Sequence, residues 1–227
     1  MSALLDLAIE AHGGWARWRE VETVTTRIAL GGAIWDVKGW PGVFADARAR
    51  IDTRRQHAEY APFVEPDRHT LYEPDRTAIV ADSSEVVGER RSPRAAFAGH
   101  TLGTRWDAHH LIYFTGYALW TYLTTPFLLK LRGVVSEEIE PWDEDGETWR
   151  RLKVTFPPGI HTHSTEQVFY FGPDGLLRRQ DYSVEIMGGT SSANYALAPV
   201  AVGGLVLPTR RRVHPIGPGN RPNRDRL

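Results

Sequence analysis

Two histidines and a glutamate lie close together in GIHTHSTEQVFYFG, residues 159–172. A His-x-His pair followed by a carboxylate is a common beginning of a metal site, because imidazole nitrogens and carboxylate oxygens are ordinary ligands of Zn²⁺ and other transition metals. The alternation that ends in Val-Phe-Tyr-Phe is equally typical of a β-strand. The stretch therefore predicts either a metal centre or a strand of a sheet that contacts a ligand.

The spacing within this stretch separates the glutamate from the histidines. On a regular strand Glu166, three residues after His163, faces the side opposite to both histidines. The three groups then meet at one metal only across a β-bulge. PPGIHTHSTEQ resembles the metal-binding motif of the cupins, but the glutamate of that family lies one or two residues further along, and its second histidine motif has no good match around His214. We therefore expect no metal and no cofactor, and histidines that bind hydrogen-bonding partners or water.

The GPDG turn at residues 172–175 predicts that the stretch is one arm of a β-hairpin. With a two-residue tip, Gln167 would lie opposite Gln180, and His163 opposite Val184. One face of this hairpin is the more apolar, so we expect it to be concave. That face would carry His161, His163, Thr165, Gln167, Phe169, Phe171, Leu176, Arg178, Gln180, Tyr182, Val184 and Ile186.

Other groups of reactive residues give weaker signals. Glu166 would face Asp181 on the outer side of the hairpin, where Arg179 would offset the repulsion, and a solvated charge network is favoured there over a two-carboxylate acid/base site. His109-His110 near the start of a helix is more typical of a surface than of a catalyst. The sequence contains no glycine-rich phosphate loop, nucleophile elbow or HExxH motif.

The elements that would position these side chains follow from periodicity and turn residues. Ser2 is expected to cap a short helix that ends at Gly13-Gly14, and Asp107 to cap an aromatic helix that ends at Pro126. The remaining segments alternate with period two and are separated by Pro, Gly, Asp and Ser. They predict strands at 24–30, 33–37, 43–51, 55–60, 69–73, 76–82, 85–91, 133–140, 147–156, 162–171, 176–186, 193–201 and 205–213.

This order predicts a mainly β protein of the α+β class. Short strands with hairpin-sized turns form antiparallel meanders, and a sheet of about 11 to 13 strands must curl or close. We expect one curved-sheet domain at 1–214 and a C-terminal tail rich in Pro, Gly and Arg at 215–227. The tail is expected to have low intrinsic order.

The helix at 107–125 carries the strongest functional signal. Its aromatic side chains crowd more than one face, which suggests a lid over a ligand cavity as well as ordinary core packing. Residues 111–129 contain no charge, but four threonines, a glycine and a proline favour a buried or lid helix over a membrane span. Contact with a membrane surface stays an open alternative. The aromatic residues are Tyr113, Phe114, Tyr117, Trp120 and Tyr122.

Bulk composition excludes several classes of protein. A formal charge of -1 on 227 residues gives no basic field for nucleic acid, and the absence of cysteine rules out disulfides and thiolate chemistry. The N-terminus has Asp6 and Glu10 in its apolar pattern and lacks a basic leader, so we expect a cytoplasmic protein. The sequence leaves the oligomeric state open.

The opening AHGGWARWREVETVT and the helix–meander–helix–meander layout resemble the LolA/LolB type of lipoprotein carriers and their mycobacterial lipid-carrier relatives. The resemblance implies a strongly curved antiparallel half-barrel whose concave apolar face is covered by helices and holds acyl chains. The carriers of that type are exported, and the sequence shows neither an export signal nor a lipobox. A cytoplasmic relative would carry, sense or act on another hydrophobic molecule.

Together these observations predict a protein that binds a hydrophobic small molecule or acyl chain between a curved sheet and a lid helix. The alternative is a cofactor-independent isomerase, cyclase or hydrolase of a lipophilic metabolite, with His163 as general acid/base. A membrane-surface or protein-interaction module is a third class. The ligand-binding residues are expected to be Trp35, Tyr113, Tyr117, Trp120, His161, His163, Gln167, Phe169 and Tyr182, with Arg178 as a further polar contact and Trp40 as a further aromatic one.

Overall fold

The computed structural model describes residues 2–224. Its helices are α1 (Ala3–Ala11), α2 (Trp15–Trp18), α3 (Ala33–Lys38) and α4 (Ala108–Thr124), with short 3-10 turns at Pro93–Phe97, Phe127–Lys130, Glu185–Met187 and Pro218–Asn220. Its strands are β1 (Thr23–Ile28), β2 (Ala47–Asp52), β3 (Ala58–Ala61), β4 (Arg68–Glu73), β5 (Arg76–Ala81), β6 (Val86–Arg91), β7 (Val135–Glu144), β8 (Glu147–Thr155), β9 (Glu166–Phe171), β10 (Leu177–Val184), β11 (Thr190–Val202) and β12 (Leu205–Pro215).

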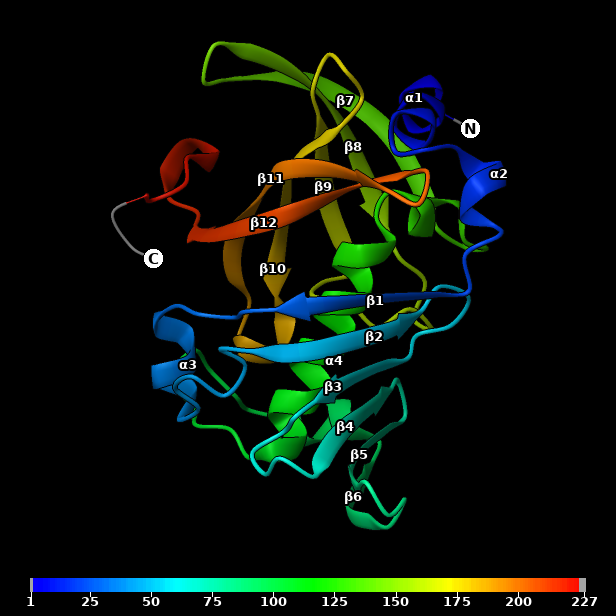
Figure 1. Cartoon of the computed structure of the whole chain (residues 1–227). Coiled ribbons are helices and arrows are strands. Elements are labelled where there is room, and N and C mark those ends of the chain that lie inside the picture. The colour runs from blue at the N-terminus through cyan, green and yellow to red at the C-terminus, as the bar shows by residue number, and fades with distance from the viewer. Residues whose placement is uncertain (1, 225–227) are drawn as a thin grey trace.

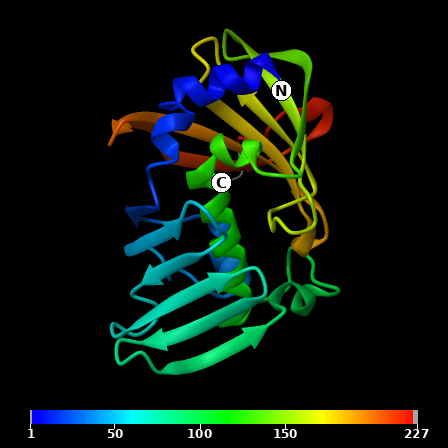
Figure 2. The ribbon, with the colours of Figure 1, turned by 90° about the vertical axis from the view of Figure 1, so that its right-hand side faces the viewer.

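Within residues 2–224 these strands form two six-stranded antiparallel meanders, one before α4 in the chain and one after it. Within each sheet the strands pair in the order of the sequence, so β1 and β12 are edges of separate sheets. Figures 1 and 2 show the two sheets curving around α4, with α1 over the upper part of the second sheet. The predicted order of helix, meander, helix and meander in a curved antiparallel fold is confirmed.

Both helix starts predicted from capping residues are confirmed. Ser2 accepts a hydrogen bond from the backbone N–H of Leu4, and Asp107 forms a reciprocal capping box with His110. A capping side chain satisfies backbone N–H groups that have no partner inside the helix. The helix α4 ends at Thr124, two residues before Pro126, as the proline predicts.

The predicted strand at 33–37 is wrong, because residues 33–38 form the short helix α3. Its alternating apolar residues span less than two helical turns, a length at which periods of two and 3.6 are hard to distinguish. Gly39 ends the helix in the left-handed conformation, with φ of 86°, which glycine adopts without a Cβ clash. The third predicted strand is correspondingly shorter and begins at Ala47.

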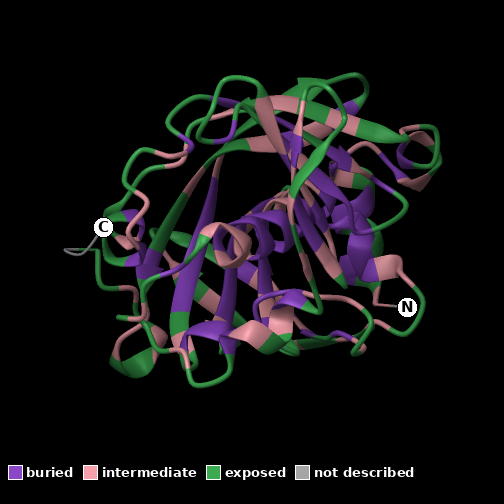
Figure 3. Ribbon diagram, turned by 90° about the horizontal axis from the view of Figure 1, so that it is seen from below, coloured by how far each residue is buried: buried purple, intermediate pink, exposed green. Residues whose placement is uncertain are grey.

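The helix α4 is a core helix, and none of its residues is exposed. Figure 3 shows it from below, in the middle of the molecule and mostly buried. Its close packing depends on Gly116, where an added Cβ would lie 2.2 Å from Tyr72 Cγ of β4. Among the described residues no helix is long and apolar enough to cross a membrane.

The register predicted for the β9–β10 hairpin is wrong by two residues. Gln167 pairs with Tyr182, and Gln180 pairs with Phe169. The turn is longer than a two-residue tip, because the Gly172 N–H binds the Leu176 carbonyl, and a bulge follows at Leu177. A shift by two residues preserves the side of the sheet on which a residue lies, so Gln167, Phe169 and Tyr182 still face the interior.

The bulge changes the outer face of this hairpin. Arg178 binds Glu147 and Asp174 at the rim rather than facing the concave side. Glu166 lies opposite Thr155 of β8 and forms an ion pair with Lys153, so the predicted approach of Glu166 to Asp181 is wrong.

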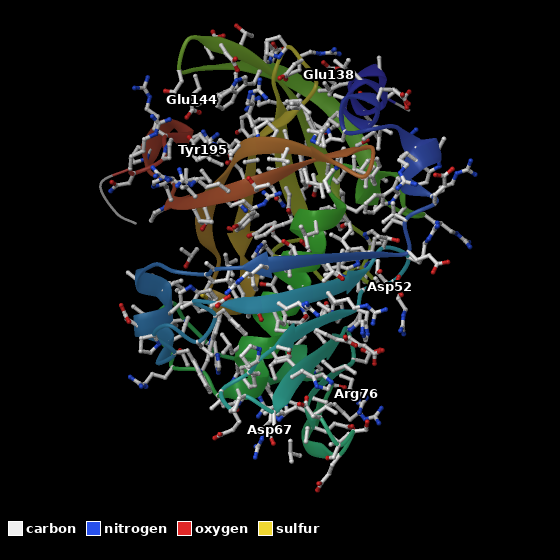
Figure 4. The ribbon with its side chains drawn as sticks, in the orientation of Figure 1. Asp52, Asp67, Arg76, Glu138, Glu144 and Tyr195 are labelled. Atoms are coloured by element: carbon white, nitrogen blue, oxygen red, sulfur yellow. The ribbon has the colours of Figure 1, made fainter. Side chains whose placement is uncertain are left out.

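A buried ionic cluster lies on the outer face of the second sheet. Arg179 is fully buried and binds Asp181 through two hydrogen bonds of 2.6 and 2.8 Å, and Glu144 at 2.8 Å. Residues 215–224 cover this cluster: the Asn220 carbonyl accepts from Arg179, and a bridge joins Ile216 to Pro222. Figure 4 shows Glu144 and Tyr195 on this side of the sheet, close to the C-terminal segment. The remainder of the predicted tail, 225–227, lies outside the described residues.

Candidate functional site

His163 is the centre of a buried group of aromatic and polar side chains between the two sheets. The Tyr117 hydroxyl lies 3.2 Å from its Nδ1, and the Tyr122 hydroxyl lies 2.8 Å from its Nε2. Its ring stacks on Tyr182 of β10 at 3.9 Å between centroids, and the Tyr182 hydroxyl lies 2.8 Å from that of Tyr122. His163 therefore joins α4 to the second sheet.

The predicted position of His163 on a strand is wrong, since β9 begins at Glu166 and both histidines lie in the preceding loop. The loop nevertheless turns His163 inward, to 1% exposure. Gln56 holds this loop by accepting from the His161 N–H at 2.7 Å and donating to the His161 carbonyl at 2.6 Å. Its hydrogen bonds fix the loop against the start of β3.

His163 is neutral at ordinary pH. Burial, assisted by the nearby charges of Arg211 and Arg94, lowers the pKa of His163 to about 3. A neutral imidazole has one N–H, so one of Tyr117 and Tyr122 donates to the ring and the other accepts from it. Such a group is a poor acid or base near pH 7, because its pKa lies far from the working pH.

His161 belongs to a second, adjoining cluster. Its Nδ1 lies 3.0 Å from the Tyr113 hydroxyl, which also accepts a hydrogen bond from Arg94 at 3.2 Å. Arg94 in turn binds Glu185 at 2.6 Å. Tyr113 and Tyr117 are neighbours on α4, 5.3 Å apart between ring centroids. The two histidines thus contact successive turns of one helix.

A row of buried amides extends this site along the concave face of the second sheet. Gln167 donates to Thr162 at 2.7 Å and accepts from Gln180 at 2.7 Å. Asn194 lies directly opposite Gln180 on β11. Both Asn194 and Gln180 are fully buried. The Asn194 amide contacts the Tyr122 hydroxyl, whereas the Asn194 Oδ1 and the Gln180 Oε1 have no hydrogen-bond partner among the described residues.

Arg211 of β12 completes this face. Its guanidinium lies over the Tyr122 ring at 4.4 Å, and its Nη2 donates to the Tyr122 carbonyl at 3.0 Å. Its Nη1 is sealed from solvent and has no hydrogen-bond partner within residues 2–224. Burial lowers the pKa of Arg211 to about 10, while the hydroxyls of Tyr122 and Tyr182 favour its charged form. Arg211 is still a cation at neutral pH.

The other predicted ligand-binding residues do not meet at this site. Trp35 of α3 reaches the cluster only through Phe114, whose ring lies 6.2 Å from Trp35 and 5.6 Å from His163, and Trp40 packs on Phe63. Trp120 donates from its indole to the Asp52 carbonyl at the end of β2. Phe169 is completely buried beside Phe156. Trp35, Trp120 and Phe169 belong to the apolar core, and Trp40 packs against it.

The structure also shows that the glutamate of the His-x-His-Glu stretch lies apart from the two histidines. Glu166 points outward to Lys153, whereas His161 and His163 contact tyrosines in the interior. Within residues 2–224 no group of three or more His, Asp or Glu side chains is arranged to hold a metal ion. The expectation of no metal and no cofactor stays a prediction.

Reasoning from the sequence did not bring Arg211, Asn194 and Gln180 together as one site. One local signal was present: residues 210–212 are three consecutive arginines on a strand, so each face of the strand, including the inner one, must carry at least one of them. Which arginine faces inward depends on the pairing of β12 with β11, where Ala196 lies opposite Arg211.

A hollow of about 570 Å³ lies on the outer surface, beside the C-terminal segment. It is lined by charged residues and prolines, including Asp143, Glu144, Asp145, Arg221 and Arg224. Its charged lining does not suit a lipophilic ligand, for which apolar walls with few polar groups are typical.

Comparison of the fold with solved structures gives two matches over nearly the whole chain. A LolA superfamily protein from Nitrosomonas europaea is 11% identical, with a TM-score of 0.50, over 96% of this chain and 86% of that one. A DUF1329 family protein from Desulfovibrio piger is 13% identical, with a TM-score of 0.52, over 94% and 85%. No family model matches the sequence, and the search of curated proteins finds no match. The two curved antiparallel meanders around α4 are thus a LolA-like fold, as the helix–meander layout of the sequence predicts.

Proposed function

We propose that the protein binds a lipophilic small molecule or an acyl chain between its two concave sheet faces, next to α4. The observation that carries the proposal is the seam between the edge strands β1 and β12, which are not joined by hydrogen bonds. Figure 1 shows turns of α4 between these two edges. A closed barrel would cover the helix there with a continuous ladder.

Apolar side chains of α4 lie at this seam. Leu119, Tyr122 and Leu123 follow one another at helical spacing and are the half-buried stripe of the C-terminal half of α4. The contact of Arg211 with the Tyr122 carbonyl puts this stripe beside β12. At one end, the seam is crossed by the chain after α1, because the His12 carbonyl accepts from Val206.

The interior behind the seam suits a lipophilic ligand. It is aromatic and aliphatic, and its few polar groups gather around His163. Ligand sites for such molecules combine apolar walls with a small number of polar groups that orient the ligand. The LolA-like fold supports the same proposal by analogy of architecture.

The neutral state of His163 favours binding over the enzyme alternative. A general acid/base is most effective when its pKa is near the working pH, and the pKa of His163 is about 3. Both ring nitrogens already contact tyrosine hydroxyls, so the imidazole is suited to holding Tyr117 and Tyr122 in place. The cytoplasmic location expected from the sequence stays a prediction.

A fluorescent undecanoyl probe tests the proposal. Titration of the wild-type protein is expected to show saturable binding, with the probe emission shifted to the blue by an apolar environment. Leu123→Gln at the seam should weaken binding about ten-fold, because the transfer of one leucine side chain from water is worth about 1.5–3 kcal/mol. Leu102→Gln is the matched control, since Leu102 is 46% exposed and lies in the loop before α4.

The proposal requires both saturable binding of the probe by the wild-type protein and a loss of affinity in Leu123→Gln that Leu102→Gln does not share. Absence of saturable binding to any single-chain or acyl probe, together with no co-purified lipophile in native mass spectrometry, would contradict it. Equal losses of affinity in Leu123→Gln and Leu102→Gln would show that the probe does not enter at the seam. Circular dichroism of both variants separates lost binding from lost folding.

A further inference from the structure

We propose that Arg211, with the amide N–H of Asn194, binds the carboxylate head of an amphiphilic ligand whose chain occupies the interior. The inference rests on the proposed function and names the chemical class of the ligand. It starts from a cation that the protein itself does not neutralise: no carboxylate of residues 2–224 lies within 4.0 Å of the Arg211 guanidinium, although many other arginines among these residues form ion pairs. Buried charges in proteins are ordinarily paired.

The hydrogen-bonding groups of Arg211 are only partly used. Nη2 donates to the Tyr122 carbonyl, whereas Nη1 is inaccessible to solvent and has no partner within the described chain. A guanidinium presents its N–H groups as a planar fork that matches the two oxygens of a carboxylate. One edge of this fork is therefore available to an anion that enters beside Tyr122.

Two amides lie on the same sheet face as Arg211. Asn194 on β11 is diagonal to Arg211 across the β11–β12 pair, and Gln180 on β10 is directly opposite Asn194. Both side chains are fully buried. Gln180 donates its amide N–H to Gln167, so the donor that faces an anion here is the Asn194 amide, which also contacts the Tyr122 hydroxyl, while the two amide oxygens have no hydrogen-bond partner among residues 2–224. Buried polar atoms without partners are rare in folded proteins, because each loses its hydrogen bonds to water.

The neighbours of these groups indicate a monoanion. The side chains around the guanidinium are the tyrosines Tyr122 and Tyr182 and the neutral His163, so one positive charge faces the site. A carboxylate carries one negative charge and accepts from both Nη1 and the Asn194 amide. A phosphate monoester carries close to two negative charges at neutral pH and would bring an uncompensated charge into the interior.

The test compares three probes that share one alkyl chain and fluorophore: a dansyl-labelled undecanoic acid, its methyl ester and the corresponding alkyl phosphate. At pH 7.5 the acid should bind the wild-type protein at least about ten-fold more tightly than the ester, because charge-assisted hydrogen bonds are lost in the ester. The phosphate should bind more weakly than the acid. Arg211→Gln should abolish the preference for the acid while retaining affinity for the ester.

Arg212→Gln is the matched control. Arg212 is the next residue on β12, is exposed and lies opposite Tyr195, on the outer face. The variant should keep the ten-fold preference for the acid. Asn194→Leu is the second variant, and we expect it to lower the affinity for the acid several-fold and to leave that for the ester unchanged. Because leucine is similar in size to asparagine and Asn194 forms few hydrogen bonds, this variant is expected to retain the fold even if Arg211→Gln does not.

The outcomes distinguish this inference from the proposed function. If none of the three probes binds, the proposed function fails. If the wild-type protein binds acid and ester equally, the function stands and the carboxylate site is refuted. Equal weakening of acid and ester by Arg211→Gln would assign the arginine to structure alone, and tighter binding of the phosphate would replace the carboxylate by a phosphate head.

Discussion

Protonation of His163 should destabilise the folded protein strongly below neutral pH. Folding lowers the pKa of His163 from the ordinary 6.5 to about 3, because the ring is buried between Tyr117, Tyr122 and Tyr182 and lies near Arg211. Above pH 6.5 the imidazole is neutral in both states and contributes no pH dependence. Below pH 6.5 the unfolded chain binds a proton that the folded protein does not, so stability falls as the pH falls.

The magnitude follows from the two pKa values. Each pH unit between them costs about 1.4 kcal/mol, so stability should fall by about 2 kcal/mol between pH 6.5 and 5, and by about 4 kcal/mol between pH 6.5 and 3. A domain of ordinary stability has about 5–15 kcal/mol in total. One histidine is therefore expected to account for a large part of the acid sensitivity of this protein.

Urea unfolding of the wild-type protein and of His163→Gln at pH 7.5, 6.5, 5.5 and 5 measures this effect. Glutamine does not titrate, and its amide keeps one donor and one acceptor for the tyrosine hydroxyls. The difference in unfolding free energy between the two proteins should change by about 2 kcal/mol from pH 6.5 to 5, in favour of the variant. Other histidines titrate in both proteins and cancel in the difference.

The reasoning would be refuted by a constant difference between the two proteins across this range. It would also be refuted by a proton NMR titration in which the His163 ring protonates near pH 6.5 in the folded protein. Either result would mean that water or a nearby acceptor stabilises the imidazolium in the interior.

Two further predictions concern packing and the outer face. Gly116→Ala should destabilise the protein by about 1–3 kcal/mol in urea unfolding, because the new methyl group overlaps Tyr72. Gly103→Ala is the control and should cost less than about 0.5 kcal/mol, because the space around its Cβ is open. Equal effects of the two variants would contradict the packing of α4 on β4. Arg179→Met should cost about 3–5 kcal/mol, because it leaves two carboxylates without their buried partner, and a loss below about 1 kcal/mol would show that solvent reaches this cluster.

Local patterns determined the elements and their order. The residues that cap α1 and α4, and the alternation of most strands, act over a few neighbouring positions and give the same structure in many contexts. The segment 33–38 departs from this rule, because a six-residue apolar alternation fits a short helix equally well. The glycine at 39, which ends α3, was the local sign of the helix.

The β9–β10 hairpin shows what the alternation of side chains along a strand can and cannot predict. The alternation of side chains predicted Gln167, Phe169 and Tyr182 on the inner face and Glu166 on the outer face, and the structure agrees. The register itself was wrong, because the length of a turn and the position of a bulge depend on hydrogen bonds that the sequence does not specify uniquely. The prediction of which residues face inward was still correct, because the register was wrong by an even number of residues.

The sequence by itself determined a LolA-like curved β fold with an aromatic central helix, because period and capping are local properties of the chain. Only the tertiary structure decided which polar groups share the interior. Arg211, Asn194 and His163 are far apart in sequence, and they meet at Tyr122 because β12 pairs with β11 while the loop before β9 folds inward. Pairing between distant segments lowers the free energy only after the whole chain is assembled, so no short stretch of the sequence reveals it.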